Sequence, residues 1–466
     1  MSSRVDLLAL RKWRASRAWA TNAVLCALGF GLLWLARQIV SENDHFTMGA
    51  SGVSGWSAIL YIAAVAVVLT QPTNRWTFRI IVAFAVLARL ATLFADPFLS
   101  SDIYRYVWDG VVQHAHVSPY RYAPGNAALM FLREPNQDIF DNINRRDYAR
   151  TIYPPVAQMI YFAVTWISPT VTMMKTAMIG FECVTCAALI ALLRMLGRPR
   201  EQVLLYAWCP LLVWEIGDAG HIDAAVIAFV VLALLFRARG NNVLTGLFLG
   251  LAVMTKFYPL VLFPALYRRG DWKMPAMVAA VVAVGYAVYS SAGTLVFGFL
   301  SGYTDEEGMA TGARYFLLQW VQSLRGLHGI STGMYYVACG LVFGAIVIWA
   351  WRRASVEGPV RGGAEPAFLK AAMMLAFALM LLFSPHYAWY VAWLIPFFAL
   401  VPSVPLLAYV IGFFYLFTTA LADPGPKMFL LNEILYGGMA VAFAVEFGLR
   451  KWGMYRWLGL EVGVGG

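Results

Sequence analysis

Apolar segments of roughly 17–25 residues recur along the whole chain, separated by short polar connectors. A helix of about 20 apolar residues spans the hydrocarbon core of a bilayer, where all backbone hydrogen bonds must be satisfied within the protein. The pattern predicts an all-α fold, a polytopic transmembrane helical bundle of about 12–14 spans. The predicted crossings are residues 19–40, 55–70, 76–95, 172–196, 203–217, 221–236, 275–292, 334–351, 368–384, 388–401, 404–422 and 429–449.

Two apolar segments break this pattern. Residues 153–168 are short and begin close to a Pro-Pro pair, so we expect them to re-enter or to lie along the membrane surface. Residues 243–266 are interrupted by T-K-F-Y-P and are expected to form two short helices that meet near Lys256. Broken helices at membrane depth are tolerated where they line protein or a cavity.

Charge placement predicts the topology. Five basic residues precede the first span, which favours a cytoplasmic N-terminus, and counting crossings puts loop 96–152 outside. We expect a multi-pass protein of the plasma (inner) membrane with an extracytoplasmic active site. No internal repeat is evident, so 1–466 is predicted to be one integral membrane domain. Within it, 1–75 supplies two N-terminal spans, 76–300 a core with outer loop 96–152, and 301–466 the C-terminal spans.

Composition excludes an ordinary soluble protein, because 61% of the residues are hydrophobic and only 13% are charged. The formal net charge of +10 comes mostly from Lys and Arg in short connectors. This distribution is a topology signal and does not predict a nucleic-acid partner. All five cysteines lie inside apolar segments. The C-x-x-C formed by Cys183 and Cys186 therefore favours packing over redox or zinc chemistry.

Loop 96–152 is the only long segment that is neither strongly apolar nor a short connector, and such loops commonly carry function. It contains D-I-Y-R-Y-V-W-D-G, in which Asp102, Arg105 and Asp109 would share one helical face with Tyr106. One interpretation is an interfacial amphipathic helix capped by Asp102, with Tyr104 and Trp108 turned toward lipid headgroups. In the other interpretation, Asp102 accepts a proton from a sugar hydroxyl.

Other ionisable residues also collect on the predicted outer face. Lys256 lies inside a broken apolar helix, where an ammonium is costly unless it is paired with a carboxylate or a phosphate. In G-H-I-D, His221 and Asp223 fit either helix capping or substrate binding, and His386 is equally ambiguous. Arg89 and Glu182 could form a mutual pair or contact a lipid phosphate.

No metal site is predicted. The short pairs His114/His116 and His221/Asp223 have no third ligand fixed by their spacing.

Several strings occur in a particular order: D-I-Y-R-Y-V-W-D-G, V-S-P-Y, Y-P-P-V-A-Q, G-H-I-D-A, K-F-Y-P and P-H-Y-A-W-Y. Together they resemble the bacterial membrane glycosyltransferases of the GT-C fold, most closely the polyprenyl-phosphate-mannose-dependent mannosyltransferases. The similarity covers residues 76–266 and, more loosely, the region around His386. This chain departs from the family in having two extra spans before the loop. It also has Ile222 where the family often has Asn, which argues against a polar role at that position.

The resemblance implies a lipid-linked sugar donor, an outer-face active site, inversion at the anomeric carbon, and neither metal nor other cofactor. It also implies that Asp102 is the general base. The substrate is expected to contact Arg105, Tyr106, Asp109, His221, Asp223, Lys256, Tyr258, Arg314 and His386.

The sequence thus predicts an enzyme, a glycosyltransferase that moves a hexose, with mannose favoured, from a polyprenyl phosphate to a lipid or glycan acceptor. Its expected partners are these substrates and membrane lipids. Another lipid-linked sugar, such as arabinose or glucose, is an alternative. A sugar or lipid transporter or flippase is a second alternative, disfavoured because no repeat is evident and the ionisable residues collect on one face.

Overall fold

The computed structural model describes residues 2–41, 52–360, 365–422 and 427–451; the regular secondary structure of these residues is helical, with no β-strand among them. In this described part, six helical segments are long and apolar enough to cross a membrane, and a seventh is possible across the bend after α13. A polytopic helical membrane fold is thereby confirmed. Five shorter apolar helices also lie in the bundle, so the count of about 12–14 crossings stays a prediction.

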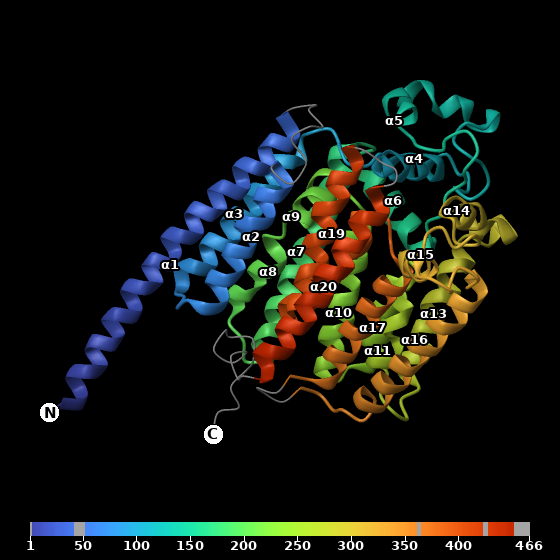
Figure 1. Cartoon of the computed structure of the whole chain (residues 1–466). Helices are drawn as coiled ribbons and strands as arrows, with labels where there is room; N and C mark the ends of the chain where they lie inside the picture. Colours follow the sequence, from blue (N-terminus) through green and yellow to red (C-terminus); the bar gives the residue numbers. More distant parts are fainter. Residues whose placement is uncertain (1, 42–51, 361–364, 423–426, 452–466) are drawn as a thin grey trace.

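The N-terminal helices α1 (Ser2–Ser41), α2 (Val53–Thr70) and α3 (Arg75–Leu93) lie side by side at one edge of the bundle (Figure 1). The α2–α3 turn ends in a capping box, in which the Asn74 side chain accepts from the Thr77 backbone and Thr77 returns the bond. Asn22 of α1 joins this cap, donating to Asn74 Oδ1 at 3.1 Å and accepting from Thr77 Oγ1 at 2.6 Å. These bonds fix the turn against α1.

The rest of the chain alternates long helices with short helical pieces. In chain order these are α4 (Asp102–His114), η2 (Ala127–Leu132), η3 (Glu134–Asn136), α5 (Gln137–Asp141), α6 (Pro155–Ile167), α7 (Val171–Met195), η4 (Arg200–Val203), α8 (Leu204–Ala207), α9 (Pro210–Leu212), η5 (Val213–Asp218), α10 (Asp223–Arg239), α11 (Asn242–Val253), η6 (Tyr258–Leu262), α12 (Phe263–Leu266), α13 (Lys273–Val288), η7 (Ser290–Phe297), α14 (Leu300–Glu306), α15 (Phe316–Ser323), α16 (Thr332–Ala354), α17 (Ala367–Phe383), η8 (Ala388–Leu394), α18 (Ile395–Leu400), α19 (Val404–Ala422) and α20 (Lys427–Lys451).

The predicted break near Lys256 is confirmed. Helix α11 ends at Val253, and the chain continues as the short pieces η6 and α12. The backbone N–H of Arg269, just after α12, donates to the carbonyl of Ser355 at 2.8 Å. Arg237, near the end of α10, donates to the carbonyl of the adjacent Ala354. Both ends of segment 242–266 therefore lie at the same end of the bundle, and Lys256 lies at the tip of a re-entrant hairpin.

Helix α6 meets this tip. Its second residue, Val156, donates its backbone N–H to the carbonyl of Met254 at 2.9 Å. The helix has only 13 residues, and Figure 1 shows it beside α4 at the upper end of the bundle. These features agree with a segment that enters from the α4 end without crossing.

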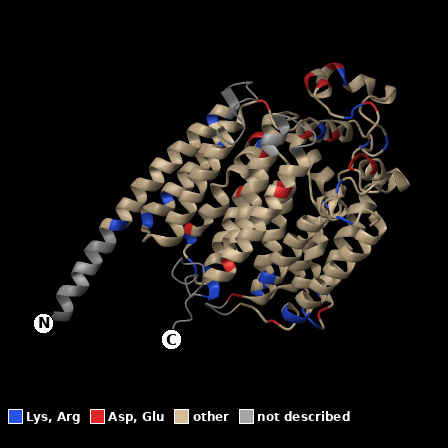
Figure 2. Ribbon diagram, viewed as in Figure 1, with Lys and Arg blue, Asp and Glu red and all other residues tan. Residues whose placement is uncertain are grey.

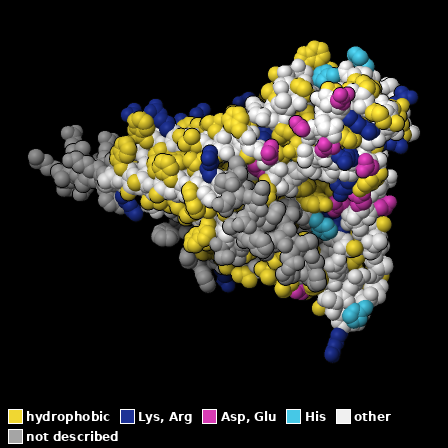
Figure 3. All heavy atoms as spheres, turned by 90° about the horizontal axis from the view of Figure 1, so that it is seen from above, with side chains coloured by type: hydrophobic (Ala, Val, Ile, Leu, Met, Phe, Trp, Pro, Cys, Tyr) yellow, Lys and Arg dark blue, Asp and Glu magenta, His cyan; other side chains and the backbone are white. Residues whose placement is uncertain are grey.

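Charged residues gather at the two ends of the bundle. Figure 2 shows blue segments, with some red ones among them, at the lower ends of the helices, and red and blue segments together near α4, α5 and α14. Seen from above, acidic, basic and histidine side chains are intermingled on the face opposite the N-terminal helices (Figure 3). The polar chemistry of the upper end is thus concentrated on one side.

Within the bundle, Arg89 of α3 and Glu182 of α7 form a buried bidentate pair, with Nη2–Oε1 at 2.7 Å and Nε–Oε2 at 3.1 Å. Arg89 also donates to the carbonyl of Ala207. Of the two interpretations of these residues, the structure supports a mutual structural pair. Removing one partner of such a pair strands a buried charge.

We therefore expect Glu182→Ala to lower the free energy of unfolding by about 3–5 kcal/mol, because Arg89 would remain charged and buried. The double change Arg89→Met, Glu182→Leu should recover most of this loss. Thermal unfolding of the detergent-solubilised protein measures both effects. As a control, Asp141→Ala breaks a surface pair with Arg146 and should cost below about 1 kcal/mol. A double variant as unstable as Glu182→Ala would contradict this assignment.

Candidate active site

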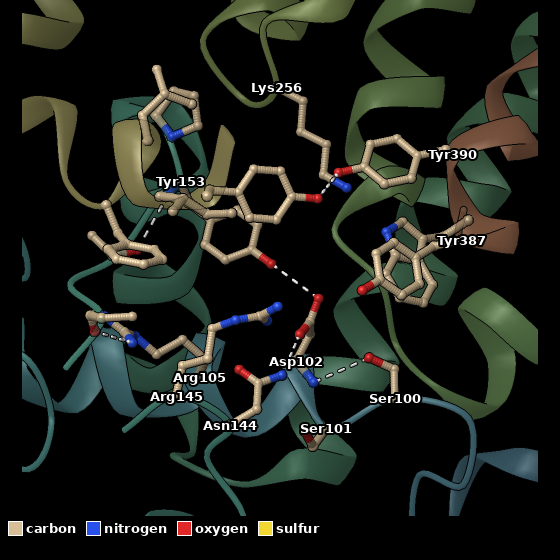
Figure 4. A pocket seen from close by; sticks show the side chains of 18 of the residues that line it. Ser100, Ser101, Asp102, Arg105, Asn144, Arg145, Tyr153, Lys256, Tyr387 and Tyr390 are labelled. Carbon is tan, nitrogen blue, oxygen red and sulfur yellow. Dashed lines mark hydrogen bonds between the residues drawn. The ribbon is translucent and has the colours of Figure 1, made fainter. Parts of the chain in front are cut away.

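A cavity of about 420 Å³ opens at the upper end of the bundle, where α4, the tip of the re-entrant hairpin and η8 converge (Figure 4). Its lining includes one carboxylate, Asp102, and four cationic side chains, Arg105, Arg145, Arg150 and Lys256. Figure 4 shows Asp102 and Lys256 extending toward each other from opposite sides. The further lining residues are Leu99, Ser100, Ser101, Asn144, Ala149, Thr151, Ile152, Tyr153, Pro154, Phe257, Tyr258, Phe299, Leu300, Tyr303, Tyr387, Trp389 and Tyr390.

Asp102 is the first residue of α4, where a carboxylate is favoured by the helix dipole. Two donors from later in the chain orient it. Asn144 Nδ2 donates to Oδ1 at 2.8 Å, and the Tyr153 hydroxyl lies 3.3 Å from Oδ2. Burial, followed by the nearby charge of Asp102, raises the pKa of Tyr153 well above its ordinary value, so this phenol stays protonated and able to donate.

Helix α4 does not turn Trp108 toward lipid headgroups as the interfacial interpretation predicts, whereas Tyr104 is half-buried. Trp108 is 1% exposed and packs on Phe140, with Leu129 in the same buried cluster. The prediction for Trp108 is wrong because residues 127–143 fold back over α4. On the opposite face, Gly110 lies against α6, since a Cβ there would lie 2.2 Å from Thr165 Oγ1. Helix α4 is therefore enclosed on both faces.

Arg105 lines the cavity from α4, and Asp109 holds it from behind. Arg105 Nε donates to Asp109 Oδ1 at 2.8 Å, and its Nη1 donates to the carbonyl of Ala149 at 3.0 Å. The buried Nη2 has no hydrogen-bond partner in the described part of the chain. Asp109 is 1% exposed and also accepts from Gln158 at 2.8 Å. This arrangement leaves donor capacity on Arg105 for an anion.

Lys256 is held by Asp223, the first residue of α10. Lys256 Nζ lies 2.6 Å from Asp223 Oδ2, and the Tyr258 hydroxyl donates to Oδ1 at 3.0 Å. Asp223 is fully buried, whereas the Lys256 side chain is 14% exposed and reaches the cavity. The carboxylate partner predicted for a deeply placed ammonium is therefore present, and the ammonium still faces the cavity.

A second layer of polar groups lies behind Tyr153. The hydroxyls of Tyr153 and Tyr106 are 3.2 Å apart, and Tyr106 Oη lies 3.4 Å from His221 Nδ1. His221 follows Gly220, whose positive φ of 67° suits glycine, and a Cβ there would meet Ile103 at 2.3 Å. His221 Nε2 faces Glu215 Oε2 at 3.4 Å. None of these groups except Tyr153 lines the cavity.

Another wall of the cavity is aromatic. Its residues come from α14, from η8 and from Tyr387, which directly precedes η8. Tyr387 stacks on Trp389 with ring centroids 4.6 Å apart, and Trp389 stacks on His221 at 4.3 Å. Tyr303 and Tyr390 share a hydroxyl–hydroxyl bond of 2.5 Å. Flat aromatic faces beside polar groups suit the apolar face of a sugar ring.

Arg314 and His386 lie behind this aromatic wall. Arg314 pairs with the buried Glu307, and its guanidinium lies 5.9 Å from the Tyr390 ring centroid. His386 Nε2 lies 3.3 Å from the Arg314 carbonyl, and its Nδ1 lies 3.8 Å from Glu307. Burial and then the charge of Arg314 lower the pKa of His386, which favours the neutral imidazole.

The predicted site residues thus fall into two groups. Asp102, Arg105, Lys256 and Tyr258 line the cavity. Behind them, in contact with lining residues or one step further away, are Tyr106, Asp109, His221, Asp223, Arg314 and His386. Among the described residues, no group of three or more His, Cys, Asp or Glu side chains is placed to hold a metal ion.

The sequence interpretation missed several lining residues and one buried acid. Asn144, Arg145 and Arg150 line the cavity, but they come from a stretch of the loop without a recognisable pattern. Tyr153 also lines it and could have been found, because it begins the Y-P-P-V-A-Q string. Glu215 could have been found, because it is a lone carboxylate within a predicted span.

A family model described as glycosyltransferase family 87 matches residues 151–385 of the chain. The match contains Tyr153, His221 and Lys256, and it begins after Asp102. Searches of curated proteins and of solved structures gave no match.

The geometry predicts an energetic coupling between Asp223 and Lys256, because each neutralises the other in a buried setting. A double-mutant cycle with Asp223→Asn and Lys256→Met should give a coupling free energy of about 1–3 kcal/mol in thermal unfolding. The matched cycle pairs Asp223→Asn with Lys273→Met, which changes an exposed lysine at the start of α13, and it should give almost none. Equal values in both cycles would contradict the pairing.

Proposed function

Because this chain belongs to glycosyltransferase family 87, we propose that it transfers a hexose, in first place mannose, from a polyprenyl phosphate to a lipid or glycan acceptor with inversion. The family and the helical fold make it a membrane glycosyltransferase. The donor, the acceptor and the side of the membrane are parts of the proposal.

One observation carries the proposal: a single carboxylate and four cationic side chains line the same cavity. A sugar linked to a polyprenyl phosphate has an anionic leaving group, and its acceptor must lose a proton. Asp102 could accept the proton and Lys256 could stabilise the anionic leaving group. The two side chains lie on opposite sides of the cavity and face each other (Figure 4). Attack and departure on opposite faces of the anomeric carbon give inversion.

The cationic side of the cavity suits a phosphate. Lys256 supplies a fixed positive charge, and Arg105 supplies its unpaired Nη2. Arg145 forms an ion pair with Glu306, whereas Arg150 has no ion-pair partner among the described residues. Charge that develops on the departing phosphate would be stabilised in place by these groups, and such stabilisation is usually the largest contribution to catalysis.

Asp102 suits the role of general base. The donors on both of its oxygens, Asn144 and Tyr153, orient the carboxylate. Removal of the acceptor proton by such a group typically contributes about 10²–10⁴-fold to the rate. Tyr387, backed by Trp389, would bind the apolar face of a sugar ring.

The extracytoplasmic placement rests on charge asymmetry. Figure 2 shows many basic residues at the end of the bundle opposite the cavity, whereas basic and acidic residues are mixed beside the cavity. Connectors rich in Lys and Arg favour the cytoplasmic side, so the cavity is expected to open on the outer side.

Incubation of the purified protein with a panel of polyprenyl-phosphate sugars tests the proposal directly. We expect acceptor-dependent loss of the mannosyl donor, with the product carrying the inverted anomeric configuration. Donor consumption and the product are followed by mass spectrometry and NMR. Use of an arabinosyl or glucosyl donor instead would overturn the assignment of the sugar. Vesicle uptake of intact sugar or lipid, with no covalent product, would support a transporter.

Asp102→Asn should abolish transfer, because the amide cannot accept the proton, while binding of the donor stays near that of the wild type. The matched control is Asp138→Asn, which changes an exposed carboxylate of the same loop outside the cavity. Turnover is measured beside donor binding and thermal stability. Retained turnover in Asp102→Asn would exclude Asp102 as the base.

A further inference from the structure

Glu215 is the one buried carboxylate near the cavity that has no cationic side chain as partner among the described residues. Others in this region are paired: Asp109 with Arg105, Asp218 with Lys175 at 3.8 Å, Asp223 with Lys256, and Glu307 with Arg314. Glu215 is 1% exposed and has only His221 as its ion-pair partner. An unpaired buried carboxylate is costly, so its presence calls for a reason.

A path of polar atoms links this residue to the proposed base; it is hydrogen-bonded as far as His221 and ends in an ion-pair contact. From Asp102 Oδ2 the steps are 3.3 Å to Tyr153 Oη, 3.2 Å to Tyr106 Oη, 3.4 Å to His221 Nδ1, and 3.4 Å from His221 Nε2 to Glu215 Oε2. Tyr106 and His221 are 0% exposed. The path therefore runs from the cavity into a region that bulk water does not reach.

The two tyrosine hydroxyls and the imidazole can each both accept and donate a proton. An ionised Glu215 is an acceptor only, so the relay requires the tautomer in which Nε2 carries the imidazole proton and Nδ1 accepts from Tyr106. The Tyr153 hydroxyl lies within bonding distance of both Asp102 and Tyr106. Its single hydrogen can therefore point toward an ionised Asp102 at rest and turn toward Tyr106 once Asp102 is protonated. After the transfer, the hydrogen that Tyr153 has received from Asp102 again faces that carboxylate.

The backbone holds the inner end of the path in place. Glu215 lies in the π-helical piece η5, a conformation often found at functional sites. The His221 backbone N–H donates to the Glu215 carbonyl at 3.0 Å, and Trp389 covers the imidazole on its other side. Neither Glu215 oxygen makes a hydrogen bond in the described part of the chain, and His221 Nε2 makes none either. The 3.4 Å approach of Nε2 to Oε2 is an ion-pair contact, which must shorten before a proton can pass.

We propose that Glu215 is the terminal proton acceptor of the transfer reaction, connected to Asp102 through Tyr153, Tyr106 and His221. This inference rests on the proposed function, because it needs Asp102 to take a proton from the acceptor. A bound donor and acceptor would fill the cavity and exclude water, so the path supplies an exit for that proton during the chemical step.

The transfer balances as follows. The acceptor O–H bond breaks, its oxygen forms the bond to the anomeric carbon, and the C–O bond to phosphate breaks with its electron pair on the phosphate. The proton enters at Asp102 and displaces one proton along the path at each of Tyr153, Tyr106 and His221. Glu215 becomes protonated and Asp102 ends as a carboxylate. After product release, the proton returns by the same path to water at Asp102.

The test compares two variants that interrupt the path with one that does not. Glu215→Gln removes the terminal acceptor, and Tyr106→Phe removes a connecting hydroxyl. The control is Tyr161→Phe. Tyr161 is fully buried and stacks on Tyr106 with ring centroids 4.7 Å apart, but its hydroxyl has no partner among the described residues.

Single-turnover rates should fall about tenfold or more in Glu215→Gln and Tyr106→Phe, with KM for both substrates nearly unchanged. Rates measured in mixtures of H₂O and D₂O should depend on the deuterium fraction along a curve in the wild type, because several protons move together. In Tyr106→Phe the dependence should become straight. Tyr161→Phe should keep the wild-type rate and curvature.

The outcomes separate this inference from the proposed function. A wild type that transfers no sugar, or an Asp102→Asn variant that still does, defeats the proposed function. An active wild type, an inactive Asp102→Asn and a Tyr106→Phe variant indistinguishable from Tyr161→Phe defeat the proton path alone. If Glu215→Gln fails to fold, as judged by thermal unfolding, the comparison of Tyr106→Phe with Tyr161→Phe decides the matter.

Discussion

The neutralisation of charge inside an apolar bundle is the constraint on which this structure depends. An ammonium or a carboxylate at membrane depth is tolerated where a partner or a cavity receives it. Lys256 meets this requirement because α11 ends before it and α10 begins with Asp223 close by. The interrupted backbone between α11 and η6 must in turn be shielded from lipid. Helix α6 and η8 supply this shield, and the cavity lies between these elements.

The sequence predicts those features that depend on hydrophobicity summed over many residues. The spans around α2, α3, α7 and α20 follow from the length of the apolar segments, and the break near Lys256 follows from a single charge and a proline. The Arg89–Glu182 pair was one of two alternatives that the residues left open, and the choice between them needed the packing of α3 on α7.

Which polar residues reach the cavity could not be predicted from spacing. Asp102 and Asp109 are seven residues apart and were expected on one face of α4, yet Asp102 lines the cavity and Asp109 lies behind Arg105. The difference arises because α6 approaches α4 at Gly110 and residues 127–143 cover Trp108. Asn144 is bound to Asp102 across 42 residues of chain. Such contacts depend on how the loop folds back, which no local periodicity encodes.

Two layers of polar residues surround the cavity, the lining itself and the buried residues behind it, and their side chains differ in role. Residues in the lining carry the groups that a substrate would touch, whereas buried carboxylates behind them hold those groups in place: Asp109 holds Arg105, and Asp223 holds Lys256 together with Tyr258. Glu215 belongs to the same layer but holds no cation. Its only charged or chargeable partner in the described chain is an imidazole, which can pass a proton on, unlike a guanidinium. The layer therefore fixes charge at two points, and at the third it supplies the imidazole and carboxylate on which the proposed proton path depends.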